Sequence, residues 1–353
     1  MVATVPGWKK GRNPGPGRSL RFGLLIPILF LGSFGWTRPS EIKLGFIGDI
    51  LPDRGVKSVI QKIGLAGLFQ NAAALFQDTD LVCANLEAAI TTSDTPLVKT
   101  FRFNSPLNLG EYLIKNKVKV VTIANNHSID YGKAGLKDTV ANLAKYQVEA
   151  FGYGDNAQAA LAPKIIELNG TRIAFVGAVC FPLEGYVYLP NSFDVGRWDA
   201  QLMKFQIQAA RRQADIVVVS LHWGIEFSHY PTASQIEIGH YCIDQGADLV
   251  MGHHPHVLQG MEIYHHKPIF YSLGNFIFDQ HYGPTTETVF AKVTIARKKI
   301  NRIELTPVFI NESVPERADE KKATTIRSNF IKYSEPFGLT DSTFKNFELT
   351  DFE

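Results

Sequence analysis

The sequence predicts an α/β fold in which helices cover one or two central sheets. Two apolar runs, Val118–Ala124 and Ile216–Ser220, are continuous rather than alternating, which is typical of strands buried on both faces. Strand-like and helix-like segments alternate along the chain, an order that favours parallel strands joined by right-handed crossovers. With 353 residues, 45% of them hydrophobic, the chain has enough apolar material for a substantial core.

Residues 1–40 are expected to form a signal peptide or an N-terminal membrane anchor. Residues 1–21 carry five basic residues and no acidic one, and an uncharged apolar stretch, residues 22–36, follows them. As a helix this stretch would be about 22 Å long, short of a hydrocarbon core of about 30 Å. We therefore favour cleavage near Ser33–Gly35 over a retained anchor. Either way the protein is expected to be exported to the cell envelope, secreted or periplasmic after cleavage, or membrane-anchored by residues 22–36.

The rest of the chain is expected to form one domain, residues 41–312, and a charged C-terminal extension, residues 313–353, with a short helix. Apolar runs predict strands at 42–47, 80–84, 118–124, 216–221 and 249–251. Helical spacing of apolar residues predicts helices at 59–76, 133–146, 201–213 and 234–245. Hairpin-like spacing predicts later strands at 268–273, 288–295 and 303–309, before a last helix at 322–333.

Polar, ligand-capable residues follow five of the predicted strands. They are Asp49, Glu87, Asn126 with His127, His222, and His254 with His256. Ligands bind outside the carboxyl ends of strands in such sheets, so we expect these side chains to converge. Carboxylate, amide and imidazole donors suit one or two divalent ions, and a two-metal site would activate water and clamp an oxyanion such as phosphate. Each motif alone also fits a turn or a packed core histidine; their coincidence at equivalent strand ends favours a shared site.

Other compositional features exclude several classes. The net charge of +2 comes without a long basic stripe, so no nucleic-acid partner is expected. The three cysteines lie far apart without a CxxC pair, which excludes a disulfide framework and a thiolate zinc site.

Six motifs, in order, resemble the bacterial capsule-synthesis CapA family, known from poly-γ-glutamate capsule assembly. They are GDIL (48–51), NLE (85–87), ANNHSIDYG (124–132), HWG (222–224), GHHPHVLQ (252–259) and SLGNF (272–276). This family is similar to calcineurin-like metallophosphoesterases, so the resemblance implies a four-layer α/β/β/α sandwich with a two-metal centre.

The resemblance also implies roles for individual residues. Asp49 and His256 would bind the first metal, and Glu87 takes the place of the bridging aspartate. The second metal would be held by Asn126, His222 and His254. His127 would stabilise the transition state. Mn, Zn and Fe are all compatible with this ligand set.

Two departures from the phosphoesterase pattern concern the first metal site, which is short of one ligand. Leu51 occupies the place of a metal-binding histidine, and an apolar side chain cannot bind metal. Glu87 is longer than the aspartate it replaces. The resemblance therefore supports the fold more strongly than the activity.

Further residues are expected around the ligands. Asp130 is expected to orient His127, although capping the next helix is an equal alternative. We predict four substrate-binding residues: Lys99, Arg102, His253 and Asn275. Lys99 and Arg102 lie in a polar loop and would hold an anionic polymer or phosphate.

Three function classes stay open. The first is an exported protein that acts on or escorts poly-γ-glutamate or a similar anionic polymer, with membrane capsule-synthase subunits as partners. The second is a free-standing metal-dependent phosphoesterase of the cell envelope, a hydrolase of the metallophosphoesterase type. The third is a binding protein with a vestigial metal site, an interpretation favoured by Leu51.

Overall fold

The computed structural model describes residues 41–189 and 191–350. The predicted signal or anchor, residues 1–40, lies outside the described residues. The larger sheet has the strand order β16-β15-β14-β1-β2-β3-β4, with β13 added to β1 and β17 added to β15. These strands are β1 (Ile42–Ile50), β2 (Leu81–Leu86), β3 (Val118–Thr122), β4 (Glu149–Phe151), β13 (Asn275–Ile277), β14 (Glu287–Ala296), β15 (Lys299–Asn311), β16 (Val314–Arg317) and β17 (Glu348–Thr350).

The second sheet has the strand order β11-β12-β10-β9-β7-β6. Its strands are β6 (Lys164–Leu168), β7 (Thr171–Val179), β9 (Ile216–His222), β10 (Leu249–His253), β11 (Met261–Tyr264) and β12 (Lys267–Phe270). Strands β1 to β4 pair in parallel, as do β7, β9, β10 and β12, whereas β14 to β17 and β11 pair antiparallel. A small ladder joins β5 (Tyr153–Gly154) to β8 (Asp194–Val195).

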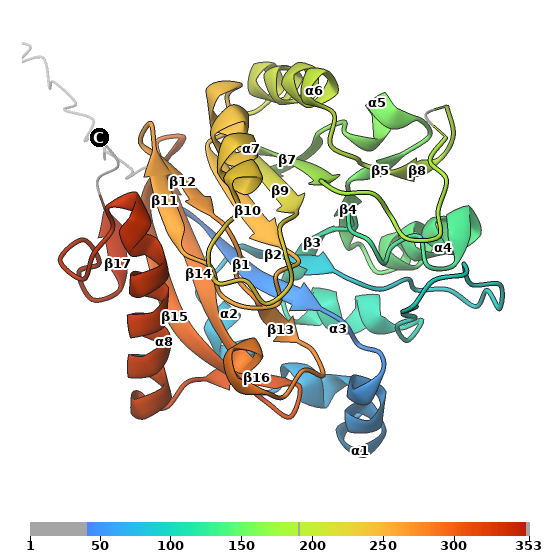
Figure 1. The fold of residues 1–353 in the computed structure, drawn as a ribbon, viewed down its shortest axis with the longest axis horizontal. Helices are drawn as coiled ribbons and strands as arrows, with labels where there is room; N and C mark the ends of the chain where they lie inside the picture. Colours follow the sequence, from blue (N-terminus) through green and yellow to red (C-terminus); the bar gives the residue numbers. More distant parts are fainter. Residues whose placement is uncertain (1–40, 190, 351–353) are drawn as a thin grey trace, which may run out of the picture. The chain divides into compact units, whose positions relative to one another are not determined.

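Helices cover the outer face of each sheet (Figure 1). The larger sheet packs against α1 (Gly55–Phe69), α2 (Ala73–Phe76), α3 (Leu109–Lys115) and α4 (Gly132–Lys145). The second sheet packs against α6 (Ala200–Gln213) and α7 (Ala233–Asp244), while α5 (Ala157–Ala160) lies against the small ladder. The predicted helix 59–76 is interrupted, because Gly64 has a left-handed φ of 70° and α2 begins only at Ala73.

The alternation of side chains along the strands places the core in three apolar layers. On β9, Ile216 and Val218 face the interior between the two sheets, whereas Val217 and Val219 face the helices. Both faces of this strand are therefore buried, as its continuous apolar run predicts. Helix, sheet, sheet and helix succeed one another, so the predicted α/β class and the four-layer sandwich are confirmed.

Four of the described helices begin at side chains that accept a hydrogen bond from the first turn. Asn156 caps α5, Asp199 caps α6, Asp319 caps α8 (Glu320–Ser334), and Thr232 forms a reciprocal capping box with Gln235 at the start of α7. Such caps satisfy backbone N–H groups that have no partner within the helix.

The C-terminal segment adds to the same body as residues 41–312. Strands β16 and β17 both pair with β15. Helix α8 spans the predicted helix 322–333, and its Ile326 and Phe330 enter the core between the sheets. Among the described residues, one helical stretch, Gly55–Phe76, has the length and composition to cross a membrane. Its Leu68 and Phe69 are buried against the larger sheet.

Candidate metal centre

The predicted ligands come together where the parallel strands of both sheets end. From the larger sheet, Asp49 lies near the end of β1, and Glu87 follows β2 directly. From the second sheet, His222 is the last residue of β9, and His254 follows β10. A site formed this way spans the two sheets, so its geometry depends on how they pack.

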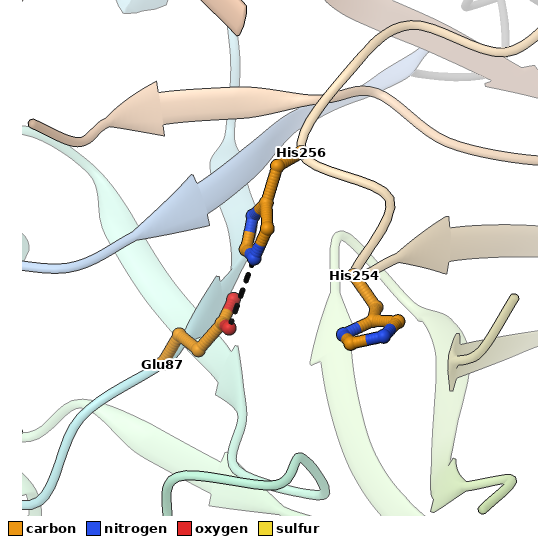
Figure 2. Close-up of side chains that lie close together, drawn as sticks. All are labelled: Glu87, His254 and His256. Carbon is orange, nitrogen blue, oxygen red and sulfur yellow. Dashed lines mark ion pairs between the residues drawn. The ribbon is translucent and has the colours of Figure 1, made fainter. Parts of the chain in front are cut away.

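Three of these residues bring donor atoms within reach of one cation. The ligand atoms of Glu87, His254 and His256 all lie within 4.8 Å of one another, and the three side chains are buried (Figure 2). Glu87 Oε1 and His254 Nδ1 are buried without a hydrogen-bond partner among the described residues. Buried polar atoms are nearly always paired, so a bound cation would satisfy both. The residues present therefore fit a divalent transition metal, for which carboxylate and imidazole are suitable ligands.

The ring of His256 is oriented by contacts at one nitrogen. Its Nδ1 lies 3.0 Å from Asn275 Oδ1 and 3.3 Å from Asp49 Oδ2, while its Nε2 lies 3.6 Å from Glu87 Oε1. When Nδ1 donates its proton to these oxygens, Nε2 is left free to bind a metal. Asn275 also donates to the backbone of His256 and Thr285, so it positions the loop that carries His256.

Asp49 is bound on several sides. Its Oδ1 accepts a hydrogen bond from Asn85 Nδ2 at 2.9 Å and lies 3.1 Å from His253 Nδ1. Burial raises the pKa of Asp49, but the contacts with His253 and His256 outweigh burial and hold it well below its ordinary value. Asp49 is therefore an ionised group that supports two histidines.

The predicted ligands of the second metal lie beside the group of three. His222 Nε2 lies 2.8 Å from Asn126 Oδ1, and the His222 and His254 rings are 4.8 Å apart. Burial keeps the pKa of His222 well below its usual range. A neutral imidazole and an amide oxygen are both capable of binding a metal.

His127 is held by a buried pair of charges. His127 Nδ1 lies 2.9 Å from Asp130 Oδ2, and Lys99 Nζ donates to Asp130 Oδ1 at 2.6 Å. Lys99 also donates to the backbone oxygen of Asn126 at 2.8 Å, and its side chain is only 3% exposed. In this structure Lys99 stabilises the Asn126–His127 loop, whereas Arg102 is exposed. Substrate binding by either residue stays a prediction.

Burial and mutual contacts shift the pKa values of all three residues of this group. Burial lowers the pKa of His254 to about 3, so its imidazole is neutral. Burial also raises the pKa of Glu87 well above its ordinary value. For His256, burial lowers the pKa, but the Glu87 and Asp49 carboxyls outweigh it and raise it to about 9. His254 and His256 have φ of 97° and 59°, a conformation that non-glycine residues hold at functional sites when their surroundings impose it.

Aromatic rings around the histidines were missed by the motif analysis. Phe103 lies 4.1 Å from the ring of His127, Phe181 lies 4.5 Å from His254, and Phe278 lies 4.7 Å from His256. Leu51 is buried with Phe103 and Phe278 in a small apolar cluster, so it belongs to this wall and supplies no ligand. No spacing signal marks these rings, because separate loops bring them together.

Comparison with known proteins places this chain in a family. The model of the family described as bacterial capsule synthesis protein PGA_cap matches residues 43–280. The PGA biosynthesis protein CapA of Bacillus subtilis (strain 168) is 31% identical over 329 residues, covering 88% of this chain and 87% of that protein. The capsule biosynthesis protein CapA of Bacillus anthracis is 28% identical over 284 residues, covering 78% of this chain and 69% of that protein.

More distant similarities are also found. A probable polyglutamine synthesis accessory protein of Mycobacterium tuberculosis (strain H37Rv) is 28% identical, covering 74% of both chains. Among solved structures, a hypothetical protein from Thermus thermophilus has a TM-score of 0.48 at 16% identity, covering 75% of this chain and 98% of that chain. The NAD nucleotidase of Haemophilus influenzae has a TM-score of 0.47 at 11% identity, covering 84% of this chain and 63% of that chain. The family match spans most of the sandwich and all of its ligand-bearing strand ends, and the chain belongs to the bacterial capsule synthesis protein PGA_cap family.

Proposed function

We propose that this protein acts in the biosynthesis or export of poly-γ-glutamate or a similar anionic surface polymer, as an exported protein with a divalent metal centre. Membership of the capsule synthesis family supports a role in the synthesis of such a polymer. The basic and then apolar order of residues 1–36 supports export. Membrane subunits of a capsule synthase are the partners that this context implies.

The observation that carries the metal centre is the buried group of Glu87, His254 and His256. Two of its donor atoms are buried and have no hydrogen-bond partner among the described residues, which is unfavourable unless a cation binds there. His222 and Asn126 lie next to this group and would hold a second ion. A bound ion of this kind acts as a Lewis acid and supplies a nucleophilic water at neutral pH.

The residues beside the ligands are suited to proton transfer. Asp130 accepts from one nitrogen of His127 and leaves Nε2 free, so that Nε2 can hold or release a proton next to the centre. Burial lowers the pKa of His127, which keeps the ring neutral near pH 7. Lys99 holds Asp130 and the Asn126 backbone in place.

A second candidate is a free-standing metal-dependent phosphoesterase of the cell envelope. The placement of Asn126 and His127 beside carboxylate and imidazole donors favours hydrolytic chemistry. Leu51 weighs against a complete two-metal site, because an apolar residue replaces one ligand. The two functions differ in whether a small phosphodiester is turned over without polymer.

The experiment measures metal content, polymer binding and phosphodiester hydrolysis on one sample of the full chain in mild detergent. We expect about one to two transition-metal ions per chain, and we expect Glu87→Ala and His254→Ala to lose most of them. Glu237→Ala on the exposed face of α7 and His266→Ala in the β11–β12 turn are matched controls that should keep the metal.

Three outcomes separate the candidates. If the protein contains metal and binds polymer but hydrolyses no phosphodiester, the capsule function is supported. If it contains metal and hydrolyses the phosphodiester, and Glu87→Ala loses this activity, the phosphoesterase function is supported. Unchanged metal content in both Glu87→Ala and His254→Ala refutes the metal centre.

A further inference from the structure

Arg54 lies beside the metal centre, at the residue before α1. Its guanidinium carbon is 4.8 Å from the centre of the Phe103 ring and 5.4 Å from that of Phe278. The same two rings contact His127 and His256, with centroid distances of 4.1 Å and 4.7 Å. One aromatic ring therefore separates Arg54 from each of these two histidines.

The position of the guanidinium is closely determined. Nη2 pairs with Asp279, whose other carboxylate oxygen accepts a hydrogen bond from Gly55 N at 2.9 Å. The backbone of Arg54 has a φ of 48°, which is uncommon for a non-glycine residue. Because two rings and a carboxylate already fix the side chain, little conformational entropy remains to be lost when it binds a ligand.

Part of this cation is available to a ligand. The side chain is 32% exposed, and Asp279 engages a single nitrogen of the guanidinium in the described contacts. Nε is buried without a hydrogen-bond partner among the described residues. The planar guanidinium fork suits bidentate recognition of carboxylate and phosphate groups. The surrounding cluster of Leu51, Phe103 and Phe278 is apolar, which strengthens a charge interaction relative to water.

We propose that Arg54 binds an oxyanion of the substrate at the rim of the metal centre, either a carboxylate of an anionic polymer or a phosphate. This inference rests on the proposed function and names the residue that selects the charged group. Sequence analysis assigned anion binding to Lys99 and Arg102, but Lys99 is buried against Asp130. Arg54 is both partly exposed and adjacent to the centre.

The test compares ligand affinity in the full, metal-loaded chain by isothermal titration. The probes are an oligomer of γ-linked glutamate and, separately, inorganic phosphate. We expect Arg54→Met to weaken binding of one probe at least about tenfold, since a charge-assisted hydrogen bond is lost. Arg54→Lys keeps the charge without the fork and should recover part of this loss. Arg212→Met, on the exposed side of α6, should bind like the wild type. The probe whose binding is weakened by Arg54→Met identifies the oxyanion as a carboxylate or a phosphate.

Asp279→Asn distinguishes ligand binding from a structural role. This variant keeps the guanidinium and both rings but removes the charged protein partner of Arg54. If Arg54 binds the ligand, Asp279→Asn should bind the probe at least as tightly as the wild type does, because residue 279 no longer competes for the guanidinium. A purely structural role predicts the same loss as in Arg54→Met.

Two results would overturn the inference, and they differ in what they say of the proposed function. If the wild type binds a probe and Arg54→Met binds it equally well, the inference is wrong and the proposed function stands. If the wild type retains its metal but binds neither probe, the anionic substrate class is wrong, and the assignment of Arg54 fails with it.

Discussion

Replacing Glu87 with glutamine should separate the stability of the metal-free protein from its stabilisation by metal. Glu87 and glutamine have nearly the same volume, so the substitution removes a charge and a ligand without opening a cavity. In the metal-free protein Glu87 is fully buried, and burial raises its pKa well above the ordinary value. An uncharged amide in this place is therefore expected to leave the free energy of unfolding of the metal-free protein unchanged or to increase it.

The metal-bound protein should respond in the opposite direction. A ligand present at 100 times its Kd stabilises the folded state by about 2.7 kcal/mol. With an unfolding entropy of about 2.1 cal/mol/K per residue, the roughly 300 residues that the structure describes give a Tm increase of about 4 °C. Glu87→Gln removes one of three converging donors, so most of this increase should disappear.

The assay is thermal unfolding of the full chain with Zn²⁺, Mn²⁺ or Fe²⁺ and with a chelator. Glu237→Gln on α7 is the matched control and should keep the metal-dependent increase. The reasoning is refuted if Glu87→Gln is as strongly stabilised by metal as the wild type. It is equally refuted if no metal raises the Tm of the wild type.

Four further predictions follow from the same geometry. Leu51→His places an imidazole at the missing ligand position, so the metal content measured by elemental analysis should rise. Burying this polar ring should cost the metal-free protein about 1–3 kcal/mol of stability, measured by urea unfolding. Lys99→Met removes the lysine that is paired with the buried Asp130 carboxylate, so it should cost about 3–5 kcal/mol in urea unfolding; a double variant with Asp130→Asn should recover part of this loss. Phe330→Ala should cost about 3–5 kcal/mol because α8 packs this ring between the sheets; a loss below about 1 kcal/mol in urea unfolding would contradict that packing. Metal affinity should fall as pH drops below about 9, because the metal-free site holds a proton on His256 that binding must displace; titrations that show no change between pH 6 and 9 would contradict this.

Local pattern was sufficient to predict the α/β class with helices outside the sheets, whereas the four-layer sandwich was implied by the family resemblance. The run Ile216–Ser220 is apolar at every position except the last, and only a strand covered on both faces buries both sets of its side chains. The ends of neighbouring parallel strands meet at one edge of a sheet, so Asp49 and Glu87, which lie at the ends of β1 and β2, were predictable as neighbours. Both inferences use periodicity and strand direction, which are properties of short segments.

Long-range packing decided the rest of the site. Lys99 and Asp130 are 31 residues apart, and their burial as a pair depends on how the loop at 91–108 folds over the Asn126–His127 segment. Arg54 and Asp279 are 225 residues apart, and they meet because β13 adds to the end of β1.

The amino-acid sequence by itself therefore determined the sandwich, the family and the set of candidate ligands. The tertiary structure alone decided that Glu87, His254 and His256 converge, that Lys99 is buried, and that Arg54 lies beside the centre. The physical reason is that convergence depends on the packing of two sheets and several loops. Such contacts join residues far apart in the chain, and no local periodicity encodes them.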